Sequence, residues 1–307
     1  MLSRIAESLF WIGRYVERAD GTARILDVHL ERLNGASAQE QETVTRELLT
    51  IMGVPQPEEY TLGSLLNTLA YTRSSTHSVA GSLGAARENA RRARETVSSS
   101  LWEALNTTWY GLGQHRRDMV GTYRFCHWVL ERTAMIRGLA DSTMSHDEAW
   151  LFLELGRSLE RADMTARMLA TRESEALGLS WVNMLRCAGA YESFLRTQRA
   201  TVGEEHAGEF LLLDRLFPRS VLRALQDAEE CLMALDPSYQ RVGFMDDARR
   251  IVGEMRSTLE YSTPDQLAAS LPIFLHQVQL SCARASEAIT NKYFSRGQEL
   301  SWVGEVS

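Results

Sequence analysis

The chain has 307 residues, of which 44% are hydrophobic and 24% are charged, and its formal net charge is −7. This composition is that of a folded globular protein, and the acidic balance argues against non-specific nucleic-acid binding, which needs an excess of Lys and Arg. The first twenty residues carry charges throughout and no apolar run has the length of a membrane span, so we expect a cytoplasmic protein without a signal peptide or membrane contact.

Apolar residues recur at spacings of three and four along most of the chain, a pattern typical of packed amphipathic helices. The first stripe starts with Leu9, Ile12 and Val16. The pattern predicts helices over residues 3–33, 39–52, 61–72, 77–110, 117–140, 146–176, 179–200, 208–216, 218–235, 243–261 and 265–294. Short connections and the lack of an alternating strand pattern favour an all-α fold, a helical bundle of about ten helices.

One charged phrase occurs twice. Residues 13–26 read GRYVERADGTARIL, and residues 156–169 read GRSLERADMTARML. The repeat predicts a single helical domain over residues 1–307, with two related halves near 1–145 and 146–307. The similarity is strong only over the motif helix, so an ancient duplication is a hypothesis.

The charges of this phrase share one helical face, because Arg14, Glu17 and Arg18 are spaced by three and four residues. Large apolar residues such as Phe10 bracket the same face, which is typical of a helix buried between neighbours. Buried charges need partners, since an isolated one costs several kcal/mol. We therefore expect the two motif helices to pack together, with Glu17 and Glu160 meeting arginines from both copies.

Three interpretations of this cluster stay open: a salt-bridge network that fixes helix register, a ligand or partner site built from arginines, and a solvated face. A glutamate among arginines has a lowered pKa and is a poor proton donor, which favours an anchoring role over acid–base work. The candidate residues are Arg14, Glu17, Arg18, Asp20, Arg24, Arg157, Glu160, Arg161, Asp163 and Arg167.

A second basic cluster lies in RENARRAR, residues 87–94, where three arginines are expected on one helical face. This face either binds an anion, such as a phosphate or a peptide carboxylate, or is solvated and paired with its own glutamates. LWEALN, residues 101–106, is expected to follow on the same long helix. The candidate residues here are Arg87, Glu88, Asn89, Arg91, Glu103 and Asn106.

Other chemistry has no support in the pattern. The four cysteines form no CxxC pair and are expected to be reduced thiols. No Glu-x-x-His, His-Glu-x-x-His or zinc-ligand spacing occurs, and no glycine-rich phosphate loop is present. We therefore predict no metal and no cofactor, and no ATP hydrolysis by this chain alone.

The repeated phrase also carries a resemblance. With SLFWIGRYVERADGTARIL near the start, GRSLERADMTARML, RENARRAR, LWEALN, FPRSV at 217–221 and ARASEAI at 283–289, the chain resembles the alpha-E family, a bacterial all-helical family named for its Glu-Arg motif. The resemblance runs nearly end to end. One departure is that Glu154 stands in the second copy where the first has Trp11.

The resemblance implies partners rather than an activity. Family members are typically encoded beside, or fused to, ATP-grasp ligases that form amide bonds, and transglutaminase-like and proteasome-related peptidases are other common neighbours. We therefore expect a non-catalytic accessory subunit that binds such a ligase, and a peptide or acidic small ligand, in peptide synthesis or modification. Two alternatives remain: an enzyme that acts on a peptide product through the Glu/Arg site, and a purely structural scaffold. The sequence leaves open whether the chain is an enzyme.

Overall fold

The computed structural model describes residues 1–115, 117–174, 177–197, 205–237 and 246–294. These residues form an all-α fold without a strand, which confirms the predicted class. Its helices are α1 (Ser3–Leu33), α2 (Ala38–Met52), α3 (Leu62–Leu66), α4 (Val79–Arg92), α5 (Ser99–Gly111), α6 (Met119–Thr143), α7 (Glu148–Glu173), α8 (Trp181–Ala188), α9 (Tyr191–Thr197), α10 (Glu205–Leu213), α11 (Val221–Leu235), α12 (Asp247–Glu260), α13 (Pro264–Ala269) and α14 (Leu271–Ile289).

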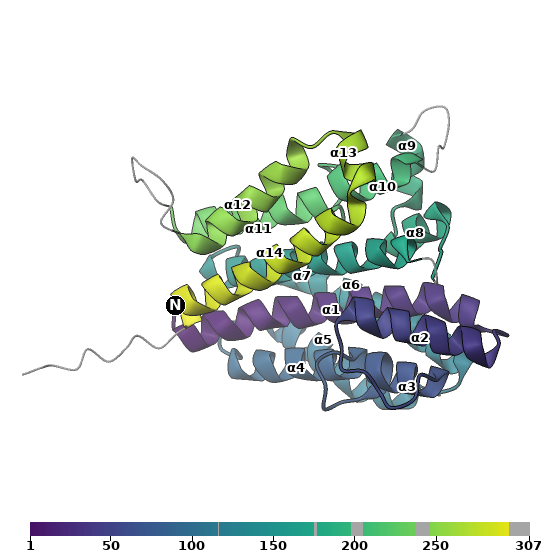
Figure 1. Ribbon diagram of the computed structural model, residues 1–307. Coiled ribbons are helices and arrows are strands. Elements are labelled where there is room, and N and C mark those ends of the chain that lie inside the picture. The colour runs from purple at the N-terminus through teal and green to yellow at the C-terminus, as the bar shows by residue number, and fades with distance from the viewer. Residues whose placement is uncertain (116, 175–176, 198–204, 238–245, 295–307) are drawn as a thin grey trace, which may run out of the picture.

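The two helices that carry the repeated phrase, α1 and α7, pack against each other through the middle of the bundle (Figure 1). On its other sides α1 contacts α4 and α6, while α7 contacts α11 and α14. Because neighbours cover both helices on most sides, even polar motif residues such as Glu17 and Glu160 are only 1% exposed.

Each motif helix has an equivalent set of neighbours. α5 contacts α4 and α6 in the first group, and α12 contacts α11 and α14 in the second. This arrangement is what related halves would produce. The boundary near residue 145 and the common origin of the halves stay predictions, and residues 295–307 of the second half lie outside the described residues.

Two glycines at matching positions of the repeat let α1 and α7 approach closely. A Cβ atom added to Gly13 would collide with the carbonyl oxygen of Leu153, and one added to Gly156 would collide with that of Phe10. Phe10 and Leu153 are themselves matching positions, so the contact is reciprocal. Glycine is required here because only it allows two backbones to come this near.

The predicted helix over residues 77–110 is wrong, because the chain turns back between α4 and α5. α4 ends at Arg92, and Ser98 caps α5 by accepting a hydrogen bond from the backbone N–H of Leu101. Ala93 and Val97 are buried in the connection. Tertiary burial of these two side chains outweighs the local helical pattern, which holds neither Gly nor Pro between them.

Two further predicted helices are divided. In the 179–200 segment Gly189 adopts a left-handed conformation, with φ of 65°, and ends α8 before α9 begins. In the 265–294 segment the break falls at Ser270, where Pro272 lies in the first turn of α14 and has no N–H to continue a preceding helix. Residues 175–176, 198–200 and 243–245, which belong to predicted helices, lie outside the described residues.

Candidate functional site

The glutamates of the two motif copies exchange arginines across the α1–α7 contact. Glu17 on α1 accepts hydrogen bonds from Nε and Nη2 of Arg161 on α7, at 3.0 and 3.1 Å. Glu160 on α7 accepts the equivalent pair from Nε and Nη2 of Arg18, at 2.6 and 3.1 Å. These are bidentate, charge-assisted contacts, and their exchange resembles a two-fold interface built within one chain.

A second pair of motif arginines binds the ends of two other helices, α8 and α2. Arg24 binds Asp20 at 2.7 Å and donates through Nη1 to the carbonyl oxygen of Cys187 at the end of α8, at 2.7 Å. Arg167 does the same at the end of α2, where Nη1 donates to the carbonyl oxygen of Ile51 at 2.7 Å. Both arginines thus satisfy carbonyls that a helix C-terminus leaves unpaired.

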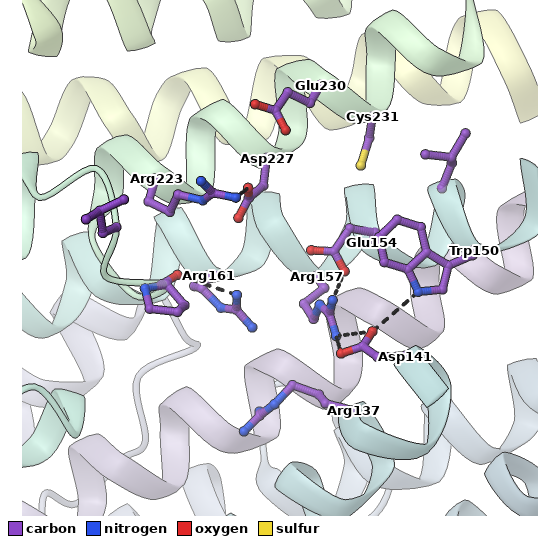
Figure 2. A pocket seen from close by; sticks show the side chains of 13 residues that line it. Arg137, Asp141, Trp150, Glu154, Arg157, Arg161, Arg223, Asp227, Glu230 and Cys231 are labelled. Carbon is purple, nitrogen blue, oxygen red and sulfur yellow. Dashed lines mark hydrogen bonds and ion pairs between the residues drawn. The ribbon is translucent and has the colours of Figure 1, made fainter. Parts of the chain in front are cut away.

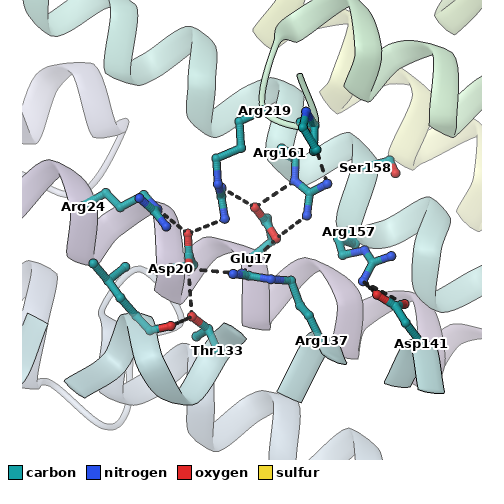
Figure 3. Close-up of polar contacts among 12 residues, drawn as sticks. Glu17, Asp20, Arg24, Thr133, Arg137, Asp141, Arg157, Ser158, Arg161 and Arg219 are labelled. Carbon is teal, nitrogen blue, oxygen red and sulfur yellow. Dashed lines mark hydrogen bonds and ion pairs between the residues drawn. The ribbon is translucent and has the colours of Figure 1, made fainter. Parts of the chain in front are cut away.

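Two more arginines, from outside the motif, contact Glu17 and its neighbour Asp20 (Figure 3). Arg219, in the segment before α11, donates to Glu17 at 2.7 Å and pairs with Asp20 at 2.8 Å. Arg137 on α6 contacts Asp20 at 3.1 Å and Glu17 at 3.4 Å. Thr133, one turn earlier on α6, donates to Asp20 at 2.7 Å.

The Glu160 side has fewer partners. Besides Arg18, Glu160 pairs with Nε of Arg14 at 2.5 Å, and Arg14 also donates to the hydroxyl of Ser286 on α14. The expected meeting of the two helices is therefore confirmed, with one difference. Each glutamate binds motif arginines of the other copy, and none from its own copy among the contacts described.

Sequence reasoning missed Arg137 and Arg219. FPRSV contains Arg219, but in the sequence this segment contributes only to the family resemblance. Arg137 follows the buried Ile136 and stands four residues before Asp141, but it pairs with Asp20 and Glu17 of α1 instead. Its role arises only when α6 packs on α1, so spacing along the chain carries no signal for it.

The carboxylates of this network stay ionised. Burial alone would raise the pKa of Glu17, but Arg161, Arg219 and Arg137 together hold it well below its ordinary value. Arginines likewise outweigh burial at Asp20 and Glu160, whose pKa values are also lowered. A carboxylate with a depressed pKa holds no proton to donate at neutral pH, so these groups are anchors for guanidinium groups.

An open pocket of about 700 Å³ borders the network, between α6, α7 and α11, and we call it the large pocket (Figure 2). The charged residues that line it are Arg137, Arg157, Arg161, Arg223, Asp141, Glu154, Asp227 and Glu230. Trp150, Leu151 and Leu216 add apolar surface. The residues contributed by α7 recur at spacings of three and four, so one face of that helix lines the pocket.

Most of these charges are paired within the pocket wall. Arg157 donates to both oxygens of Asp141 at 3.1 Å and also pairs with Glu154. Glu154 stands where the first copy has Trp11, so the departure from the repeat supplies a pocket carboxylate. Arg223 pairs with Asp227 at 2.7 Å on α11.

A smaller cavity of about 180 Å³ lies beside the Glu160 half of the network. Its charged lining includes Arg14, Arg18 and Arg167 together with Glu160 and Asp163. Asp163 is the intrahelical partner of Arg167, at 2.7 Å. Arg14 and Arg18 thus line this cavity, whereas their counterparts Arg157 and Arg161 line the large pocket.

The second predicted cluster lies apart from the motif. Arg87 on α4 donates to Asn106 on α5 at 2.8 Å, so these two residues meet across a pair of helices. Arg91 binds Glu88 through two hydrogen bonds on the exposed surface, while Arg94 lies beyond the end of α4, so the expected three-arginine face is wrong.

The remaining two residues of that cluster have no link to the network. Asn89 donates to the carbonyl oxygen of Ala85 at 2.8 Å, and Glu103 is exposed. None of the six candidates lines either cavity beside the motif. Their role in binding stays a prediction.

Two features are absent from the described part of the chain. No group of three or more His, Cys, Asp or Glu side chains there has the arrangement of a metal site. No described helix combines the length and apolar character needed to cross a membrane. The four cysteines are free and buried.

Comparison with protein families identifies the family of this chain. Residues 1–294 match Alpha-E, described as a predicted alpha-helical domain with a conserved ER motif. An uncharacterised protein of Mycobacterium bovis is 26% identical over 299 residues, and one of Mycobacterium tuberculosis strain H37Rv is 27% identical over 301 residues. Each match covers 86% of this chain and 33% of the relative, so the chain spans about a third of the length of these relatives. No solved structure matches.

Proposed function

Because this chain belongs to the Alpha-E family, we propose that it is a non-catalytic binding subunit that works with an ATP-grasp ligase in peptide synthesis or modification. The observation that carries the binding role is the large pocket, which lies directly beside the buried motif and has its arginines in the lining. Its volume of about 700 Å³ falls within the range of sites that hold small ligands, roughly 300 to 1,000 Å³.

The different roles of the motif glutamate and arginine support binding over catalysis. Glu17 is buried and ionised, and it holds Arg161 through two hydrogen bonds. Arg161 in turn lines the large pocket. The glutamate therefore positions an arginine that a ligand reaches, and it lacks the raised pKa that a general acid of an enzyme acting on a peptide would need.

The partner is proposed from the proteins that are encoded beside, or fused to, members of the family. The alpha-E resemblance implies an ATP-grasp ligase as the first partner, with transglutaminase-like and proteasome-related peptidases as others. The length of the relatives also supports a partnership with another protein or domain. In them the matching region makes up only 33% of a longer protein, so the helical domain there works alongside other sequence.

A reciprocal pull-down from the native host tests this partner. The tagged chain is expected to recover a protein with ATP-grasp sequence motifs, and the tagged ligase is expected to recover this chain. In a reconstituted reaction the pair should form an amide bond from ATP, while this chain alone should consume no ATP. Recovery of no ATP-grasp protein in either direction would overturn the partnership.

A purely structural scaffold is the second candidate, and the sealed motif favours it. Glu17 and Glu160 are each 1% exposed and lie within ion pairs that fix the register of α1 against α7. This candidate predicts that weakening the motif lowers stability with no separate loss of ligand or partner binding.

A further inference from the structure

Charge is distributed unevenly around the large pocket. Next to the motif four arginines surround Glu17 and Asp20: Arg24, Arg137, Arg161 and Arg219. Four guanidinium groups against two carboxylates leave an excess of positive charge, and Arg137 and Arg161 expose it to the pocket.

The rest of the lining has the reverse balance. Four carboxylates there face two arginines: Asp141, Glu154, Asp227 and Glu230 against Arg157 and Arg223. The whole pocket is therefore close to neutral but dipolar. A ligand with one negative and one positive end would satisfy both sides, whereas a simple anion would satisfy only one.

The carboxylates that α11 contributes to the pocket are only partly compensated by arginines. Asp227 and Glu230 are three residues apart on α11 and both line the pocket (Figure 2). Glu230 is exposed, accepts a hydrogen bond from Gln226 at 2.8 Å and forms no ion pair with a described residue. Burial raises the pKa of Asp227, and the neighbouring Arg223 counters this shift only in part.

Apolar residues also line the pocket. Trp150 and Leu216 belong to the pocket lining, and Leu216 is 86% exposed at the edge. An exposed leucine beside a charged pocket offers contact to an apolar part of a ligand. The volume of about 700 Å³ holds more than an inorganic anion or a single amino acid.

We propose that the large pocket binds a short peptide as a zwitterion, with its carboxylate at Arg137 and Arg161 and its free amine at Asp227 and Glu230. This inference rests on the proposed binding function and names the ligand class. Carboxylate–guanidinium contacts orient one end, and the ammonium group contacts the α11 carboxylates at the other. The side chains of the peptide lie against Trp150 and Leu216.

Calorimetric titration with a small panel tests the assignment. The probes are the tripeptide Ala-Leu-Ala with both ends free, with the amine acetylated, with the carboxylate amidated and with both ends capped, and then free leucine and inorganic phosphate. The free tripeptide should bind most tightly. Each single cap should weaken binding roughly tenfold, as expected for losing a charged hydrogen bond. Leucine and phosphate should bind more weakly still.

Charge reversal on the wall sharpens the test. Glu230→Lys should lower the affinity for the free tripeptide roughly fivefold and raise that for the acetylated form, because it replaces the amine site with a cation. Glu230 is exposed, so the variant is expected to fold. The matched control is Glu131→Lys, at an exposed position on α6 outside the pocket lining, and it should bind all probes as the wild type does.

Each other outcome overturns a defined claim. Equal binding of the free and the acetylated tripeptide would show that the carboxylates of α11 do not bind the amine. Phosphate binding as tight as that of the tripeptide would show that the pocket is only an anion site. Binding of no probe by the wild type would overturn the peptide assignment. The ligase partnership is judged separately, by the reciprocal pull-down, so the two proposals fail independently.

Discussion

At the scale of single residues, the repeated Glu-Arg phrase is a set of buried ion pairs whose members depend on one another. Glu17 offsets the charge of Arg161 and shares Arg219 and Arg137 with Asp20. Removing one partner of a buried pair leaves the other without compensation, which costs more than the pair itself contributes.

Glu17→Gln should therefore lower the free energy of unfolding by about 3–5 kcal/mol. Glu160→Gln should cost less, because Arg18, one of its two arginine partners, is more exposed than Arg161 and water can solvate it. Urea unfolding monitored by circular dichroism measures both values. A loss below about 1 kcal/mol at Glu17 would show that the network is solvated. Equal losses at the two sites would show that the exposure of Arg18 does not matter.

The same carboxylates predict that the stability of the protein falls at low pH. The native pKa values of Glu17, Asp20 and Glu160 lie below their unfolded values, so the unfolded chain binds protons first as the pH falls. Their stabilisation is present above the unfolded pKa of about 4 and is lost progressively below it. Melting temperatures from pH 7 to pH 3 should fall less steeply for Glu17→Gln than for the wild type; parallel curves would contradict the assignment.

At the scale of elements, the contact between α1 and α7 depends on two glycines. Alanine is a better helix former than glycine by about 1 kcal/mol, so propensity alone predicts that Gly13→Ala stabilises the protein. Collision with Leu153 predicts the opposite, a loss of about 1–3 kcal/mol from overpacking. Gly138 on α6 is the control, since a Cβ there meets nothing within 4 Å.

Thermal unfolding distinguishes these effects. Gly13→Ala and Gly156→Ala should both lower the melting temperature, whereas Gly138→Ala should raise it slightly. A gain of stability at Gly13 equal to that at Gly138 would mean that the two helices can separate without cost, and that their contact does not set the register of the motif.

How far the sequence predicts this architecture differs from element to element. The meeting of α1 with α7 follows from a charged face bracketed by apolar residues, because buried charges require partners and the other copy supplies them. The turn between α4 and α5 does not follow, since burial of Ala93 and Val97 decides it and their local pattern is helical. Arg137 joins the network only through the packing of α6, which spacing along the chain does not encode.

At the scale of the whole molecule, matching arginines of the two copies serve two different cavities. Arg161 lines the large pocket and Arg18 lines the smaller one, although each binds the opposite glutamate in the same bidentate way. The two copies therefore share a structural role in the centre of the bundle. In the proposed function the two copies differ in the cavities that they line, because only the large pocket binds the peptide.

The central claim, that the motif holds the bundle together and also positions a ligand-binding arginine, is tested most directly by comparing Arg161→Gln with Arg18→Gln. Both variants break one reciprocal ion pair, so both should lose stability in urea unfolding. At a temperature where both remain folded, only Arg161→Gln should bind free Ala-Leu-Ala more weakly than the wild type, by roughly tenfold in calorimetry. Wild-type affinity in both variants would contradict the claim and leave the motif with a structural role alone.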